Sequence, residues 1–159
     1  MASLEEEIGA LLRKHSLKLA VAESCTGGLI ANRITNISGS SDYFERGFVT
    51  YSIKAKQELL GVPLKTIEKF GVVSSQTALA MAEGARKRSK TDLGVGVTGI
   101  AGPTGGTPDK PVGLVYIALS YDKGNICKEF KFKADRIGIK ERASDEALKL
   151  IKEYLEAKE

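Results

Sequence analysis

The sequence predicts an α/β fold in which helices pack on a mixed β-sheet that includes at least one antiparallel hairpin. Short, almost uninterrupted apolar segments at 18–22 and 92–98 are typical of buried strands. Amphipathic segments of helical period alternate with such strands along the chain, as in α/β proteins. Two strand-like segments are separated only by Asp122-Lys123-Gly124, which favours a tight hairpin turn.

The first part of the chain combines two helices with two strands. Ser3 and Glu6 have the spacing of a capping box, which predicts that a helix starts at Leu4. The segment 47–51 is rich in β-branched and aromatic residues and predicts a strand. In order, we expect a helix after Ser3, a strand at 18–22, a helix at 26–35, a loop at 38–42 and a strand at 47–51.

The second part contributes three more helices, a buried strand and the hairpin. Gly61 and Gly71 mark the ends of two short helices, because glycine commonly follows the last helical residue. Ser74 is a good cap for the long helix that follows it. In order, we expect helices at 54–60, 64–70 and 76–89, a strand at 92–98, a loop at 99–111, strands at 112–121 and 125–133, and a helix at 137–155.

Composition bounds the class of protein. A chain of 159 residues with 42% hydrophobic and 28% charged residues predicts one globular domain, residues 1–159. No apolar run approaches the ~18 residues of a membrane span, and the acidic N-terminus does not resemble a signal peptide. We therefore expect a cytoplasmic protein with no membrane partner. The net charge of +4 is too mild, and aromatic residues too few, to favour nucleic-acid binding.

The scarcity of histidine and cysteine limits the possible chemistry. Cys25 and Cys127 lie far apart without the spacing of a zinc site or a disulfide framework. His15 is the only histidine, and we expect it at the surface. The sequence thus predicts no metal site and no cofactor, and it argues against an ordinary Ser-His-Asp triad.

A candidate nucleophile follows the first strand. Ser24 lies in a corner of small and hydroxyl residues between a strand and a helix, where backbone N–H groups can hold an anion. With histidine scarce, Lys56 is the natural activating base, assisted by Tyr51, and Lys54 is a second positive charge near it. Three alternatives stay open: Ser24 as a helix cap, Cys25 as the nucleophile, and Lys56 as a surface lysine.

Further candidates concern ligand binding. Glu23 can bind a ligand hydroxyl or form an ion pair with a lysine. The loop that starts at Gly99 lacks the Gly-Lys-Ser/Thr of a Walker motif, but its glycines allow backbone N–H groups to approach a phosphate or a carboxamide. Arg136 can bind phosphate, or it can act as a capping or surface residue.

Six blocks of the sequence resemble the CinA C-terminal domain family, over about residues 4 to 155. They are Ala22-Glu-Ser-Cys-Thr-Gly-Gly28, Gly39-Ser-Ser41, Phe44-Glu-Arg-Gly-Phe-Val-Thr-Tyr-Ser52, Gly71-Val-Val-Ser74, Thr98-Gly-Ile-Ala-Gly-Pro103 and Lys110-Pro-Val-Gly113. The resemblance implies a three-layer α/β/α sandwich on a mixed, mainly parallel sheet. It also implies a homodimer.

The activity implied by this resemblance is that of a nicotinamide-nucleotide amidase, which hydrolyses nicotinamide mononucleotide to nicotinate mononucleotide and ammonia. By motif, the catalytic residues would be Ser24, Lys56 and Tyr51, with no metal. The expected substrate-binding residues are Glu23, Thr26, Gly27, Gly28, Gly99, Gly102, Gly105, Gly106 and Arg136. Backbone N–H groups of this set would hold the oxyanion, and Arg136 together with the glycine loop would hold the phosphate. The alternative is a non-catalytic nucleotide-binding module that acts in a competence or DNA-damage response.

Overall fold

The computed structural model describes residues 1–158 and contains, within them, one sheet of five strands in the order β2-β1-β3-β4-β5. β1 (Leu19–Glu23) lies parallel between β2 (Phe44–Val49) and β3 (Leu93–Gly99). β4 (Leu114–Tyr121) is antiparallel to β3, and β5 (Gly124–Lys131) is antiparallel to β4. Every strand except β4 therefore points the same way, and the predicted mixed, mainly parallel sheet with a hairpin is confirmed.

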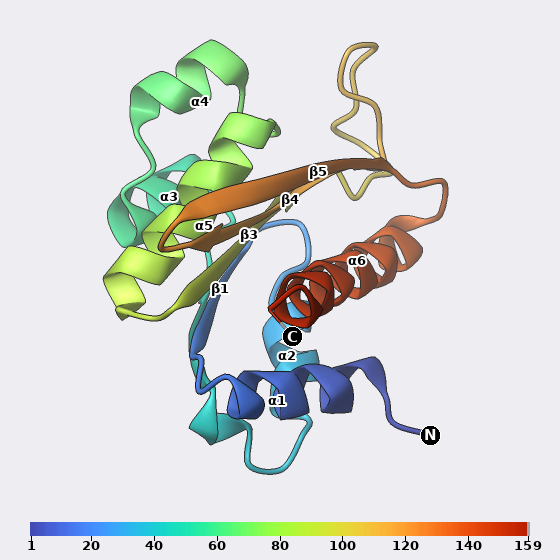
Figure 1. Ribbon diagram of the computed structural model, residues 1–159. Helices are drawn as coiled ribbons and strands as arrows, with labels where there is room; N and C mark the ends of the chain where they lie inside the picture. The colour runs from blue at the N-terminus through green and yellow to red at the C-terminus, as the bar shows by residue number, and fades with distance from the viewer. Residues whose placement is uncertain (159) are drawn as a thin grey trace.

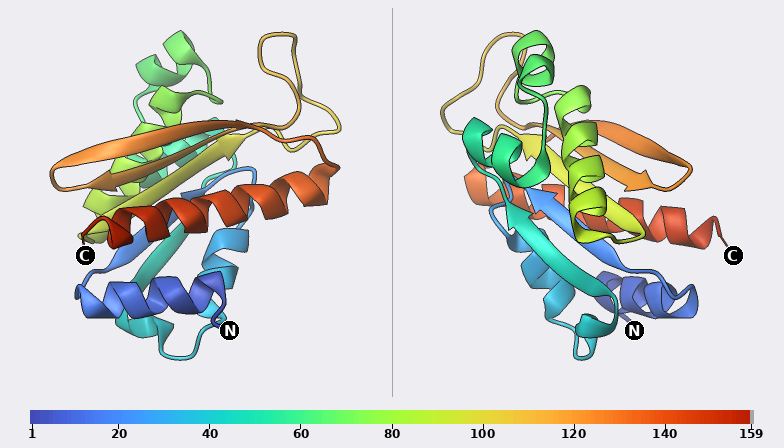
Figure 2. Two further views of the ribbon diagram at one scale, coloured as in Figure 1. Left: turned by 45° about the vertical axis from the view of Figure 1, so that its right-hand side comes forward. Right: turned by 90° about the vertical axis from the view of Figure 1, so that its left-hand side faces the viewer.

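Helices cover both faces of the sheet and complete the predicted three layers (Figures 1 and 2). One face carries α5 (Ser75–Ser89), with α3 (Ile53–Leu60) and α4 (Leu64–Phe70) packed beside it. The other face carries α1 (Leu4–Lys14), α2 (Leu29–Thr35) and α6 (Arg136–Glu156). None of these helices, within residues 1–158, has the length and apolar character needed to cross a membrane.

The two faces of the sheet carry cores of different kinds. Large side chains such as Leu19, Val21 and Val95 pack beneath α1, α2 and α6. On the opposite face, Gly94 and Gly96 leave room for α5, because a Cβ at either position would overlap the backbone of that helix. The strand pattern of large residues alternating with glycine is thus explained by the close approach of α5.

Most predicted boundaries hold within two residues, and the starts of one helix and one strand differ by three residues. The helix expected at 26–35 begins only at Leu29, because Gly27 and Gly28 adopt left-handed φ angles of 60° and 103° in a turn before it. The strand expected at 47–51 is β2, which begins at Phe44. His15, expected at the surface, is partly buried as the C-cap of α1.

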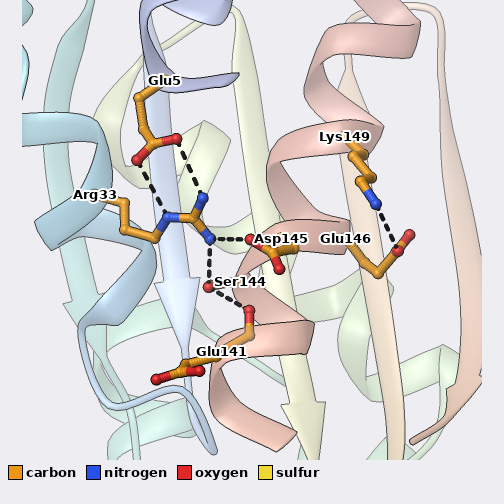
Figure 3. Close-up of polar contacts among 7 residues, drawn as sticks. All are labelled: Glu5, Arg33, Glu141, Ser144, Asp145, Glu146 and Lys149. Carbon is orange, nitrogen blue, oxygen red and sulfur yellow. Dashed lines mark hydrogen bonds and ion pairs between the residues drawn. The ribbon is translucent and has the colours of Figure 1, made fainter. Parts of the chain in front are cut away.

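A guanidinium group joins three helices on the α6 face (Figure 3). Arg33 of α2 donates to both carboxylate oxygens of Glu5 in α1, and to Asp145 and Ser144 in α6. Its side chain is only 20% exposed, so these charges attract one another through a partly desolvated environment. The network holds α2, the helix that follows Ser24, against α6.

Candidate active site

Three segments meet at the carboxyl ends of the parallel strands around one cavity of about 460 Å³. Ser24 follows β1, Tyr51 and Lys56 follow β2, and the glycine-rich loop follows β3. The cavity is lined by Ser24, Cys25, Tyr51, Lys56, Gly71, Val72, Val73, Thr98, Gly99, Ile100, Ala101, Gly102, Thr104, Gly105, Thr107, Lys110 and Arg136. Its place agrees with the general location of ligand sites in α/β sheets.

Ser24 and Lys56 are in direct contact, although 32 residues separate them in sequence. The Lys56 Nζ lies 3.0 Å from the Ser24 Oγ, and the Lys56 side chain is fully buried. The same amine donates to the Thr50 carbonyl at 2.6 Å, and the Tyr51 carbonyl lies 3.5 Å away. Burial disfavours the ammonium form and lowers the pKa of Lys56 to about 8.

This geometry aims the lone pair of the neutral amine. A neutral amine keeps two N–H groups, and the two backbone carbonyls of Thr50 and Tyr51 provide acceptors for both. When both N–H groups are given to these carbonyls, the lone pair is left to accept a hydrogen bond from the Ser24 hydroxyl, the third polar neighbour of Nζ. The arrangement suits proton transfer from Ser24 to Lys56, and it excludes the surface-lysine interpretation.

Local sequence explains why Lys56 points inward. Ser52 caps α3 by accepting a hydrogen bond from the Ala55 N–H at 3.0 Å, which fixes the first turn of the helix. Lys56 and Leu60 are four residues apart and form the buried side of α3. Lys54 lies on the exposed side and pairs with Glu58, so it does not add its charge to the Lys56 environment.

Glu23 caps α2 and does not line the cavity. Its carboxylate is 1% exposed and accepts hydrogen bonds from the N–H groups of Gly28, Ile30 and Ala31 at 2.9–3.2 Å. These donors are consequently occupied and cannot hold a bound anion. Of the alternatives for Glu23, the structure supports neither the ligand contact nor the lysine pair.

The three residues after Cys25 lie outside the cavity around Ser24. Thr26, Gly27 and Gly28 line a separate hollow of about 410 Å³ against the first turns of α6. The Gly27 N–H donates to the Ser24 carbonyl at 3.1 Å and the Gly28 N–H to Glu23. The oxyanion role expected for the Gly27 and Gly28 N–H groups is therefore corrected, because both donors are already used within the fold.

Cys25 is a poor nucleophile in this environment. Its side chain is buried beside Ser24, and burial raises the pKa of the thiol to about 12. A thiol with that pKa carries almost no thiolate at neutral pH, and thiolate is the reactive form. The electrostatics oppose the cysteine alternative.

Tyr51 and Arg136 form a polar pair at the edge of the cavity. The Arg136 guanidinium donates to the Tyr51 hydroxyl at 2.9 Å and to the Gly102 carbonyl at 2.6 Å. The Tyr51 side chain is 60% exposed, and only its carbonyl approaches Lys56. Arg136 is the first residue of α6, but the cap itself is Asp135, which accepts from the Gly138 N–H.

The glycine-rich loop contributes most, but not all, of the residues expected from it. Gly99, Gly102 and Gly105 line the cavity, whereas Gly106 does not. Lys110, at the end of the loop, was not among the expected site residues. Its ammonium donates to the Phe70 and Val73 carbonyls and so ties the loop to the segment between α4 and α5.

The other lining residues that the prediction missed include Val72, Val73, Thr98 and Thr107. Except for Thr107, they lie in the blocks Gly71-Val-Val-Ser74 and Thr98-Gly-Ile-Ala-Gly-Pro103, which would have pointed to them. Within residues 1–158, no cluster of three or more histidine, cysteine or carboxylate side chains has the geometry to hold a metal ion.

Comparison with known proteins places these features in a family context. The model of the CinA C-terminal domain matches residues 1–155. A CinA-like protein of Syntrophus aciditrophicus is 53% identical over 98% of this chain and 37% of its own length. A putative competence-damage inducible protein of Caldicellulosiruptor bescii is 51% identical over 96% of this chain and 37% of its own length. The chain thus spans little more than a third of these relatives.

Solved structures match over nearly the whole fold. The competence/damage inducible protein CihA from Agrobacterium tumefaciens is 43% identical, with a TM-score of 0.85 over 95% of this chain and 97% of its own. A CinA superfamily protein from Klebsiella pneumoniae 700603 is 27% identical, with a TM-score of 0.93 over 97% of this chain and 96% of its own.

Proposed function

The chain belongs to the CinA C-terminal domain family, and we propose that it hydrolyses the carboxamide of nicotinamide mononucleotide, releasing nicotinate mononucleotide and ammonia. The observation that carries the proposal is the buried Lys56 amine, 3.0 Å from the Ser24 Oγ at the wall of a cavity. A buried lysine that touches a cavity serine has little structural value, since desolvating an amine costs free energy. It has a clear chemical use as a general base.

In the first half of the reaction, neutral Lys56 accepts the Ser24 proton while the Ser24 Oγ attacks the carboxamide carbon. The C=O electrons move to the oxygen and give a tetrahedral oxyanion. The Cys25 N–H follows the nucleophile, as in other strand–turn–helix sites, and has no acceptor from another residue in the described part of the chain. We assign it to the oxyanion.

In the second half, the Lys56 ammonium returns its proton to the leaving nitrogen, and the C–N bond breaks to release ammonia. An ester links Ser24 to the nicotinoyl group. Water then gives a proton to Lys56, its oxygen attacks the ester carbon, and the C–Oγ bond breaks. The acid leaves, and Ser24 recovers its proton from Lys56. The two halves of the reaction therefore need a single base, Lys56, which acts once in each half.

The cavity suits an anionic mononucleotide in size and charge. Its volume of about 460 Å³ lies within the range of small-molecule sites. Val72, Val73 and Ile100 supply apolar surface for a ring. Lys110 and Arg136 add positive charge, and no carboxylate is among the described lining residues. The proposed role of Tyr51 is to position Arg136 through its hydroxyl, and to orient Lys56 through its carbonyl.

The test measures ammonia and nicotinate mononucleotide released from nicotinamide mononucleotide, with a chelator present. We expect turnover by the wild type, loss of at least ~1000-fold for Ser24→Ala and for Lys56→Met, and retained turnover for Cys25→Ala. Retained turnover in Ser24→Ala with loss in Cys25→Ala would move the nucleophile to the thiol. Loss of turnover in the chelator would show a metal-dependent reaction instead.

A second candidate function comes from the names of the relatives. Several are called putative competence-damage inducible proteins, which describes a response and no chemistry. The same cavity would then bind a nucleotide without turning it over and act through a protein partner. A folded wild type that binds nicotinamide mononucleotide as tightly as Ser24→Ala, without releasing ammonia, would support this function.

A further inference from the structure

The cations that line the cavity differ in how much of their hydrogen-bonding capacity is left for a ligand. The Lys56 amine is surrounded by Ser24 and the two backbone carbonyls after β2. It therefore has no N–H group to spare for a substrate anion. Lys110 and Arg136 are the other cations among the described lining residues, and both donate to neutral oxygens.

Lys110 lies where a charge can be offered to the cavity. Its Nζ donates to the Phe70 carbonyl at 2.7 Å and the Val73 carbonyl at 2.6 Å, which uses two of the three ammonium protons. Carbonyls orient the ammonium but do not neutralise it. The third N–H and the full charge are left, on a side chain that lines the cavity.

Gly71 makes this placement possible. A Cβ at Gly71 would lie 2.5 Å from the Lys110 Nζ, too close for any other residue type without displacement of the ammonium. Gly71 also has a φ of 90°, which side chains other than glycine rarely adopt. Glycine at position 71 thus leaves the room in which the ammonium lies.

We propose that Lys110 binds the phosphate monoester of the substrate and thereby selects phosphorylated over unphosphorylated nicotinamide compounds. This inference rests on the proposed function, because the neutral carboxamide must face Ser24 and the phosphate is then the anion left to be bound. Lys110 is a binding residue in this scheme and takes no part in proton transfer. Arg136, which the sequence already suggested, also lines the cavity.

The decisive variant is Lys110→Gln, because glutamine keeps N–H donors for the carbonyls of residues 70 and 73 while it removes the charge. We expect the KM for nicotinamide mononucleotide to rise about 10–100-fold, the size of one lost charge-assisted contact. The KM for nicotinamide riboside and kcat should stay within about threefold. Lys110→Arg should restore most of the preference, and exposed Lys65→Gln, on α4, should leave both substrates unchanged.

An equal rise in KM for the phosphorylated and the unphosphorylated substrate would overturn the proposal, since it would show that Lys110 only holds the loop. Binding measured by calorimetry in the Ser24→Ala background separates this failure from that of the proposed function. In that background, adding Lys110→Gln should raise the Kd of nicotinamide mononucleotide about 10–100-fold and leave the Kd of the riboside unchanged. That ratio tests Lys110 even if the wild type releases no ammonia, and thermal melts confirm that each variant is folded.

Discussion

The buried amine of Lys56 predicts a specific dependence of turnover on pH. Only neutral Lys56 accepts the Ser24 proton, and burial lowers the pKa of Lys56 from 10.5 to about 8. At pH 7 about a tenth of the molecules then carry the neutral amine, against about one in 3000 for an unshifted lysine. Burial therefore raises the competent fraction at neutral pH about 300-fold.

The assay is kcat/KM for ammonia release from nicotinamide mononucleotide between pH 5.5 and 10, in buffers of constant ionic strength. We expect a rise of about tenfold per pH unit below pH 7, a half-maximal value near pH 8 and a plateau above pH 9. The rise of kcat/KM with pH should follow the deprotonation of one group, Lys56. A rise that continues to pH 10, or a profile flat from pH 6 upward, would contradict the assignment of Lys56 as the base.

Three further predictions concern stability and positioning. Lys56 binds a proton more weakly in the folded chain than in the unfolded chain, so the free energy of unfolding of the wild type rises with pH between about 8 and 10.5. Lys56→Met lacks this gain, and urea titrations should show its stability relative to wild type falling by about 3 kcal/mol from pH 7 to pH 11. Glu23→Gln places an amide NH₂ against backbone N–H donors, so we expect the free energy of unfolding to fall by about 1–3 kcal/mol and kcat to fall at least ~10-fold with KM little changed. An unchanged kcat in the folded variant would show that Glu23 does not position Ser24. Arg33→Met should lower the free energy of unfolding by about 1–2 kcal/mol, between the values for exposed and buried ion pairs. Lys149→Met, at the exposed pair in Figure 3, should lower it by under ~0.5 kcal/mol, and equal losses of stability in the two variants would contradict this account.

The elements of this fold follow closely from local sequence patterns, because each depends on features within a few residues. Ser3, Ser52 and Ser74 cap their helices, and Gly61 ends α3 in a left-handed conformation. The strand order could not be predicted in the same way, since it depends on contacts between distant residues. The late start of α2 was missed because its cap is the side chain of Glu23, five residues before the first N–H that it binds.

The candidate site was predicted in its residue types and only partly in its contacts. Ser24 and Arg136 lie at element ends and Lys56 in the first turn of a helix that the pattern located, and the structure brings all three to one cavity. The direction of the Tyr51 hydroxyl depends on Arg136, 85 residues away, and could not be read from either segment. Lys110 has no periodic pattern around it to suggest a role, and only its place in the block Lys110-Pro-Val-Gly113 could have pointed to it.

The alternation of side chains along β1 explains how one short segment provides both the nucleophile and its support. Leu19 and Val21 point to the α2 face of the sheet, and Glu23 continues this series to reach the N–H groups of α2. Ala20 and Ala22 point to the opposite face, where they pack with Leu60 of α3. Ser24 continues that second series, since its N–H still pairs with the Val97 carbonyl of β3, and it meets Lys56 one turn before Leu60. A slip of one residue in β1 would exchange the two faces and remove both the cap and the Ser24–Lys56 contact, so the register of this strand sets the chemistry of the site.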